Sequence, residues 1–205
     1  IEISVLASVI ATIIGGLLGV FIYEYKRLAT PVMVGVNFLY TIPSISMLGL
    51  LLYVSGVGNT TAIIALVIYA LLPMVRNTFT GLNQIDQAMC EAGIALGLTR
   101  IQRLWNIEIP LAMPTIMAGI RTMLVMTIAL TGIASFIGAG GLGVAIYRGI
   151  TTNQSALTIA GSLLIALLAI TVDALFSLGE RVTHISPHMK RYTIIFVSIM
   201  TIIAM

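Results

Sequence analysis

The chain is organised as long apolar runs separated by short polar segments. Five runs are long enough to cross a bilayer, which takes about 20 helical residues. They cover approximately residues 3–23, 28–54, 60–81, 114–137 and 156–178, and a sixth apolar run extends from 192 to 205. This pattern predicts an all-α integral membrane protein with five complete transmembrane helices and a truncated sixth.

Composition supports a membrane protein and excludes two other classes. Of the 205 residues, 59% are hydrophobic and 8% are charged, whereas a soluble domain carries roughly 25% charged residues. A soluble fold this apolar would expose large aggregating patches. The net charge of +3 does not indicate nucleic-acid binding, because the basic residues lie at the ends of apolar runs rather than on one face.

The basic residues also predict an orientation in the membrane. If the loop after the first run is cytoplasmic, nearly all lysines and arginines fall on or near the cytoplasmic side, as the positive-inside rule requires. These residues are Lys26, Arg27, Arg76, Arg100, Arg103, Arg121, Arg181, Lys190 and Arg191, and only Arg148 falls outside. The same alternation makes the sixth run cross outward.

The longest cytoplasmic connection, residues 82–113, is predicted to be structured. Asp86 is a good N-cap for a short helix reaching about Leu96, and Gly97 is a natural helix stop. Met89, Ala92 and Leu96 share one face of that helix by their spacing. A structured cytoplasmic segment in a small membrane protein indicates a docking surface.

A second short helix is expected in the same connection. Thr99 followed by Gln102 has the spacing of a capping box. We expect Pro110 and Pro114 to close the segment, because proline interrupts the helical hydrogen-bond ladder.

This connection resembles the EAA loop of ABC importer permeases. The resemblance rests on Glu91–Gly97 followed by Ile107–Pro110, whose spacings all match that motif. Gly93 stands where the family has a second alanine, and Ile109 stands where it has leucine. A glycine could loosen the helix by about 1 kcal/mol relative to alanine.

Three further stretches are similar to one branch of that family, the permeases for glycine betaine, carnitine, choline, related quaternary amines and ergothioneine. They are residues 40–44, 71–78 and 137–143. The resemblance implies a type I ABC importer permease fold, with a transmembrane permease domain over 1–180 and a cytoplasmic connector over 181–191. Residues 192–205 would then begin a further transmembrane helix leading to a C-terminally fused external binding domain.

The resemblance also implies partners and a mechanism. Two cytoplasmic ATPase subunits would carry ATP and magnesium. A second permease copy would complete a homodimer in the lipid bilayer of the bacterial cytoplasmic membrane. The chain itself would hold no cofactor. The residues that the resemblance assigns to ATPase coupling are Asp86, Glu91, Ala92, Gly93, Leu96, Gly97, Thr99 and Pro110.

A candidate solute pathway lies in the second apolar run. Pro43 should break the helical ladder there and free a carbonyl group, which Thr41 or Ser44 could satisfy. The family resemblance points to a pathway lined by Asn37, Tyr40, Thr41, Pro43 and Ser44. The alternative is that these small and polar residues only hold helices together.

The glycine-rich stretch after the fourth run formally satisfies the pattern of a dinucleotide site. That site requires a strand before it and a helix after it, whereas this stretch lies between two membrane spans. We expect instead a tight turn or re-entrant loop near the outer gate, formed by Gly138, Gly140, Gly141 and Gly143.

No catalytic or metal site is predicted. The chain has no phosphate-binding loop sequence for ATP, one cysteine, and two histidines, His184 and His188, separated by Pro187. Asp173 lies inside the fifth run near its inner end, eight residues before Arg181. A structural role for Asp173 at the membrane interface is favoured over a place in a cation path.

Two alternatives to a betaine permease remain open. One is an ABC permease for another small solute, such as methionine or another amino acid, because the coupling loop does not report on the solute. The other is a secondary transporter, which would usually place acidic residues at the centre of a span. The chain has none there.

Overall fold

The computed structural model describes residues 2–183, and the side chains of residues 2–178, as helices and connecting turns. The long helices are α1 (Glu2–Glu24), α2 (Lys26–Thr41), α3 (Ser44–Ser55), α4 (Asn59–Asn83), α7 (Ile109–Ala134) and α9 (Ser155–Thr183). The shorter ones are α5 (Gln87–Ala95), α6 (Arg100–Arg103), a π-turn (Leu104–Glu108), a 3₁₀ turn (Ser135–Ile137) and α8 (Gly143–Thr151). The described part contains no strand, which confirms the all-α prediction.

Four of the five expected spans are continuous helices, and the second is not. The continuous ones are α1, α4, the helix over Arg100–Ile137 and the first 24 residues of α9. In the second, α2 and α3 meet at an angle of 97°, so this span is a bent pair of helices with the break that the sequence predicts at Pro43. Proline locks φ and lacks an N–H, so the ladder breaks at Pro43, which becomes the N-cap of α3. The sixth run lies outside the described residues.

The α1 helix packs closely along α4 because its buried face is made mostly of small residues. That face consists of Ser4, Ala7, Ser8, Ala11, Gly15, Gly19 and Ile22. A Cβ atom at position 15 would lie 2.8 Å from the Met74 Cβ, so only glycine allows this approach. Small residues that let helix backbones meet are typical of membrane bundles.

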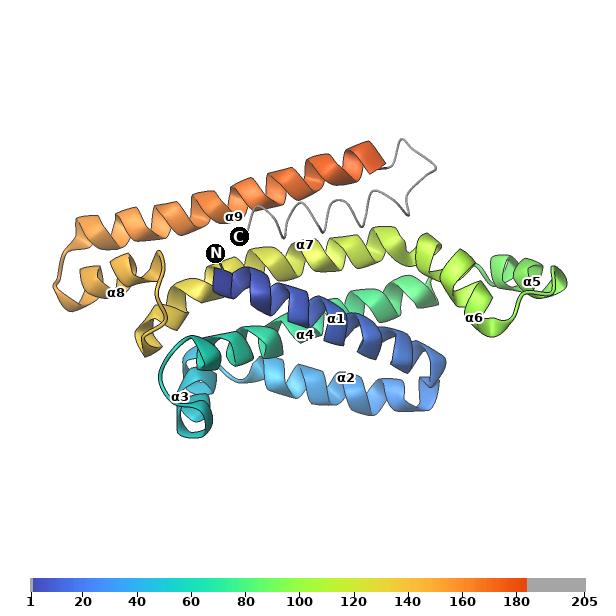
Figure 1. Ribbon diagram of the computed structural model, residues 1–205, viewed down its shortest axis with the longest axis horizontal. Coiled ribbons are helices and arrows are strands. Elements are labelled where there is room, and N and C mark those ends of the chain that lie inside the picture. The colour runs from blue at the N-terminus through green and yellow to red at the C-terminus, as the bar shows by residue number, and fades with distance from the viewer. Residues whose placement is uncertain (1, 184–205) are drawn as a thin grey trace.

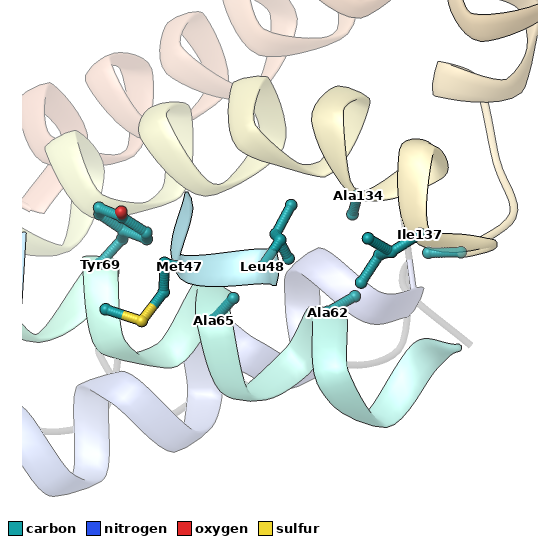
Figure 2. Close-up of a cluster of buried hydrophobic side chains, with 8 residues drawn as sticks. Met47, Leu48, Ala62, Ala65, Tyr69, Ala134 and Ile137 are labelled. Atoms are coloured by element: carbon teal, nitrogen blue, oxygen red, sulfur yellow. The ribbon is translucent and has the colours of Figure 1, made fainter. Parts of the chain in front are cut away.

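The folded-back α3 helix closes one end of the bundle by apolar packing. Met47 and Leu48 of α3 are buried against α4 and the end of α7, as Figure 2 shows. The other members of this cluster are Ala62, Ala65, Tyr69, Ala134, Ile137 and Ala139. Because α3 buries side chains on α4, the bend after α2 is held by tertiary contacts as well as by Pro43.

The two ends of the bundle carry different elements (Figure 1). The α1–α2 turn, α5 and α6 lie at one end, and α3, the glycine-rich loop and α8 lie at the other. Lys26 and Arg27 therefore share an end with Arg100 and Arg103, whereas Arg148 in α8 lies at the opposite end. This separation agrees with the predicted distribution of basic residues across the membrane.

Candidate coupling segment and solute pathway

Both ends of α5 are capped by residues close in sequence. The Asp86 carboxylate accepts a hydrogen bond from the Ala88 N–H at 3.0 Å, which satisfies one of the free N–H groups at the helix start. At the other end Gly97 has φ +75°. The N–H of Leu98 bonds to the Gly93 carbonyl and the N–H of Gly97 to the Ile94 carbonyl, which is a Schellman motif. The predicted helix and both its ends are confirmed.

The predicted second helix begins as expected but does not end as expected. Thr99 and Gln102 form the capping box in both directions. The helix then continues through a π-turn into α7, so Pro110 and Pro114 do not close the segment. The N–H of Ile109 bonds to the Leu104 carbonyl five residues back. Pro110 has no backbone N–H to donate, and this loss would break a regular α-helix. The wider π-turn accommodates it.

The face of α5 that bears the predicted docking residues points away from the bundle. Glu91, Ala92 and Leu96 are all exposed, and Leu96 has 79% of its surface accessible. The Glu91 carboxylate accepts a hydrogen bond from the Gln87 side chain at 2.9 Å. An exposed apolar helix face with one charged edge is suited to binding another protein.

Gly93 is the only buried residue of α5. A Cβ atom there would lie 2.8 Å from Ile107 Cδ1 and 3.3 Å from Arg103 Cγ. The substitution of alanine by glycine noted in the motif therefore lets α5 approach the helix that leads into α7.

Sequence reasoning missed a buried acid beside this contact. Glu108, the last residue of the π-turn, is 1% exposed, and its carboxylate accepts a hydrogen bond from Arg103 Nε at 2.6 Å. The Cys90 thiol of α5 donates to the same carboxylate at 3.8 Å. Burial, followed by the charge of Glu108, raises the pKa of the Cys90 thiol. The five-residue spacing gave no signal of this pair, because Arg103 and Glu108 share one face only across a π-turn.

A cleft opens between this cluster and the α1–α2 turn. It has a volume of about 670 Å³ and is lined by Tyr23, Glu24, Tyr25, Lys26, Arg27, Leu28, Cys90, Arg100, Arg103 and Glu108. An ion pair between Arg100 and Glu24 crosses it. The α5 and α6 helices therefore approach α1 through polar groups around a cleft rather than through a packed apolar surface.

The candidate pathway residues lie around the break at Pro43. The break frees the Ile42 carbonyl, and the hydroxyl of Tyr69 in α4 donates to it. Thr41 does not fill this role, because its hydroxyl donates to the Phe38 carbonyl at 2.7 Å. Tyr40 stacks edge-on against Tyr69 with ring centroids 6.0 Å apart.

The remaining pathway candidates, Ser44 and Asn37, are half-buried. Ser44 lines a small hollow together with Tyr69, Leu130 and Ile133, and Asn37 lies on α2. The break, the two tyrosines and Ser44 thus form one local site at the junction of α2, α3 and α4.

The glycine-rich loop has the backbone geometry that glycine permits. Gly138 and Gly141 have φ values of +81° and +101°, which confirms a tight turn there. A side chain at Gly143 would run into the Gly132 backbone, so α8 folds back directly on α7. The α8 helix was not predicted, since nine residues rich in glycine give a weak periodic signal.

Asp173 pairs with an arginine that the sequence did not point to. Arg121 Nη2 in α7 donates to Asp173 Oδ2 at 2.7 Å in a two-bond ion pair. The pair ties α9 to α7, which supports the structural role and assigns it to Arg121. Arg76 is exposed on α4, while the Asn77 amide donates to the Pro73 carbonyl and packs against Gly119.

Comparison with known proteins agrees with this arrangement. Residues 9–184 match the family described as binding-protein-dependent transport system inner membrane component. The glycine betaine/carnitine/choline permease protein OpuCD of Bacillus subtilis is 43% identical over 189 residues, which cover 92% of this chain and 82% of that protein. The ergothioneine transport permease/binding protein EgtU of Helicobacter pylori is 39% identical, and the match covers 85% of this chain and 32% of that protein.

The fold is also shared with a solved transporter. An inward-facing structure of the methionine ABC transporter MetNI superposes with a TM-score of 0.81 at 21% identity, covering 88% of this chain and 90% of that one. At this identity the likeness establishes the fold alone.

Proposed function

We propose a solute class and a coupling route for this chain, which belongs to the family of inner membrane components of binding-protein-dependent transport systems. It is a membrane-embedded transport subunit of an ABC importer. The solute that we assign to it is a betaine-type compound bearing a quaternary ammonium group. The named solutes of the relatives, which include glycine betaine, carnitine, choline and ergothioneine, support this class.

The aromatic pair at the broken helix suits such a solute. Tyr40 and Tyr69 lie beside Pro43 and Ser44 at the junction of α2 and α4. A quaternary ammonium group cannot donate hydrogen bonds but is attracted to aromatic faces. We therefore assign solute contact to Tyr40, Thr41, Pro43 and Ser44, with Asn37 one turn away on α2.

The capped and exposed α5 helix is the observation that carries the coupling route. A nine-residue helix held at both ends by local caps keeps its shape while it presents Glu91 and Leu96 outward. In our proposal α5 occupies a groove on a separate cytoplasmic ATPase, which binds ATP and magnesium. Closure of two ATPase subunits moves α5 in each of two permease copies, and the spans switch between outward-facing and inward-facing states.

An extracytoplasmic binding domain delivers the solute in this proposal. Its fusion to the permease is supported by the ergothioneine relative, whose name joins a permease and a binding protein. The glycine-rich loop and α8 lie at the end of the bundle opposite to α5, where we place the outer gate.

Uptake of labelled solutes tests the assignment. The whole importer is expressed in cells that lack their own betaine and methionine importers, and uptake is measured for glycine betaine, carnitine, choline, ergothioneine and methionine. We expect at least one quaternary amine to be taken up and to resist competition by excess methionine. Uptake of methionine alone would overturn the solute class and leave the family membership unaffected.

A further inference from the structure

Glu108 is a charged residue placed where burial demands partners. Among the described residues it is the only acid or base classed as buried, at 1% exposure. An ionised carboxylate out of water is costly unless it is paired and hydrogen-bonded. Arg103 supplies the charge, with its side chain 14% exposed and its Nε 2.6 Å away. The same carboxylate also faces residues of two other helices.

Those other helices are α5 and α1. Cys90 of α5 donates its thiol to Glu108 Oε1 at 3.8 Å. Tyr23, near the end of α1, lines the same cleft as Glu108 and Cys90. The Glu108 cluster (Glu108, Arg103, Cys90 and Tyr23) therefore joins α5, α1 and the helix that continues as α7 at one buried point.

Apolar packing holds α5 only around Gly93, so the polar cluster matters more. The only buried residue of α5 is Gly93, and a cleft of about 670 Å³ lies between α5 and the α1–α2 turn. The nearby Arg100–Glu24 pair is a second link to α1, but the Arg100 side chain is 59% exposed. Exposed pairs contribute little to stability, because water screens the two charges.

We propose that Glu108 is a positioning residue that makes α5 and the end of α1 move with α7 as one body. The proposal rests on the role assigned to α5 in the proposed function. A displacement of α5 then reaches α7 through the backbone of the π-turn and reaches α1 through Tyr23. Without Glu108, α5 still binds the ATPase, but its displacement is lost before it reaches α1.

The test measures transport and ATP hydrolysis in the same proteoliposomes, using the assembled importer with Glu108→Gln. Glutamine keeps the volume and an acceptor oxygen but removes the charge that holds Arg103. We expect import per ATP hydrolysed to fall by about tenfold, a typical size for coupling between sites. ATPase-subunit binding should stay intact. Glu2→Gln, the same change at the exposed opposite end of α1, should leave the ratio unchanged.

Equal losses of import and hydrolysis, or an unchanged ratio, would show that Glu108 does not transmit motion. Failure of the proposed function is distinguishable, since the unmodified importer would then show no ATP-dependent import or would not retain the ATPase.

A second variant keeps the test decisive if Glu108→Gln fails to assemble. Tyr23→Cys removes one member of the cluster and creates a partner for Cys90, the only native cysteine of the chain. We expect the import ratio to fall and to recover when a short bis-maleimide joins the two thiols. The reaction needs mildly alkaline buffer, because burial and Glu108 raise the pKa of Cys90. The control Tyr23→Cys/Cys90→Ser should not recover. Inhibition by the cross-link would show that α1 and α5 must separate, which contradicts the proposal.

Discussion

A helix is interrupted at each end of the bundle, and the backbone groups that the interruption frees are satisfied in different ways at the two ends. At the α5 end the free N–H and carbonyl groups are satisfied by neighbours within a few residues, such as Asp86 and Thr99. At the α3 end the Ile42 carbonyl is satisfied by Tyr69, 27 residues away on another helix. The first end is locally self-sufficient and can move as a unit. The second holds its shape only while the bundle stays packed.

The largest effect should come from breaking the local stop of α5. Gly97 has φ +75°, and a side chain there costs roughly 1–2 kcal/mol. Unwinding would also remove the donors that serve the carbonyls of Gly93 and Ile94. We expect Gly97→Val to abolish uptake and to weaken co-purification of the ATPase subunit, while solute binding to the external domain is unchanged.

Gly35→Val is the matched control for that substitution. A side chain at Gly35 meets no atom within 4 Å, and its φ is not positive. Uptake that survives Gly97→Val as well as it survives Gly35→Val would remove α5 from the coupling route.

An intermediate effect is expected from the long-range bond at the other end. Tyr69→Phe keeps the ring against Tyr40 but removes the donor to the carbonyl of Ile42, which is half-buried. A buried group left unsatisfied costs about 1–3 kcal/mol, and the cost here should lie at the lower end of that range. We expect a lower thermal unfolding midpoint for the detergent-purified permease. Tyr53→Phe, at a side chain 98% exposed, provides the comparison, and equal midpoints for the two variants would argue against tertiary control of the bend.

The smallest effect should come from the N-cap of α5. Asp86→Ala removes the acceptor for the Ala88 N–H and should cost about 1 kcal/mol. A loss of that size corresponds to roughly a fivefold weaker affinity for the ATPase subunit. Asp86→Asn retains a capping oxygen and should bind nearly normally. If asparagine were as damaging as alanine, the charge of Asp86 rather than its cap would be important.

This contrast also explains what could be predicted from sequence. The spans, the caps at Asp86, Gly97 and Thr99, and the break at Pro43 depend on residues within one or two turns, so local rules predict them. The partner of the Ile42 carbonyl and the partner of Asp173 come from other helices. Periodicity along one helix carries no information on which residue faces it from another.

The buried acid was missed for a related reason. Glu108 lies inside a recognised motif, but a regular α-helix would not have brought it onto Arg103 and Cys90. The π-turn at Leu104–Glu108 makes that meeting possible, and a single wide turn leaves little trace in composition or hydropathy.

The π-turn also determines the direction in which α5 projects from the membrane domain. Adding one residue to a helix rotates the preceding part of the chain by about 100° around the helix axis, relative to the part that follows. The side of the membrane domain on which α5 stands is therefore determined by a residue count between Leu104 and Glu108 as much as by side-chain chemistry. A single-residue insertion or deletion there would rotate the docking face around the bundle while leaving every contact residue of α5 unchanged.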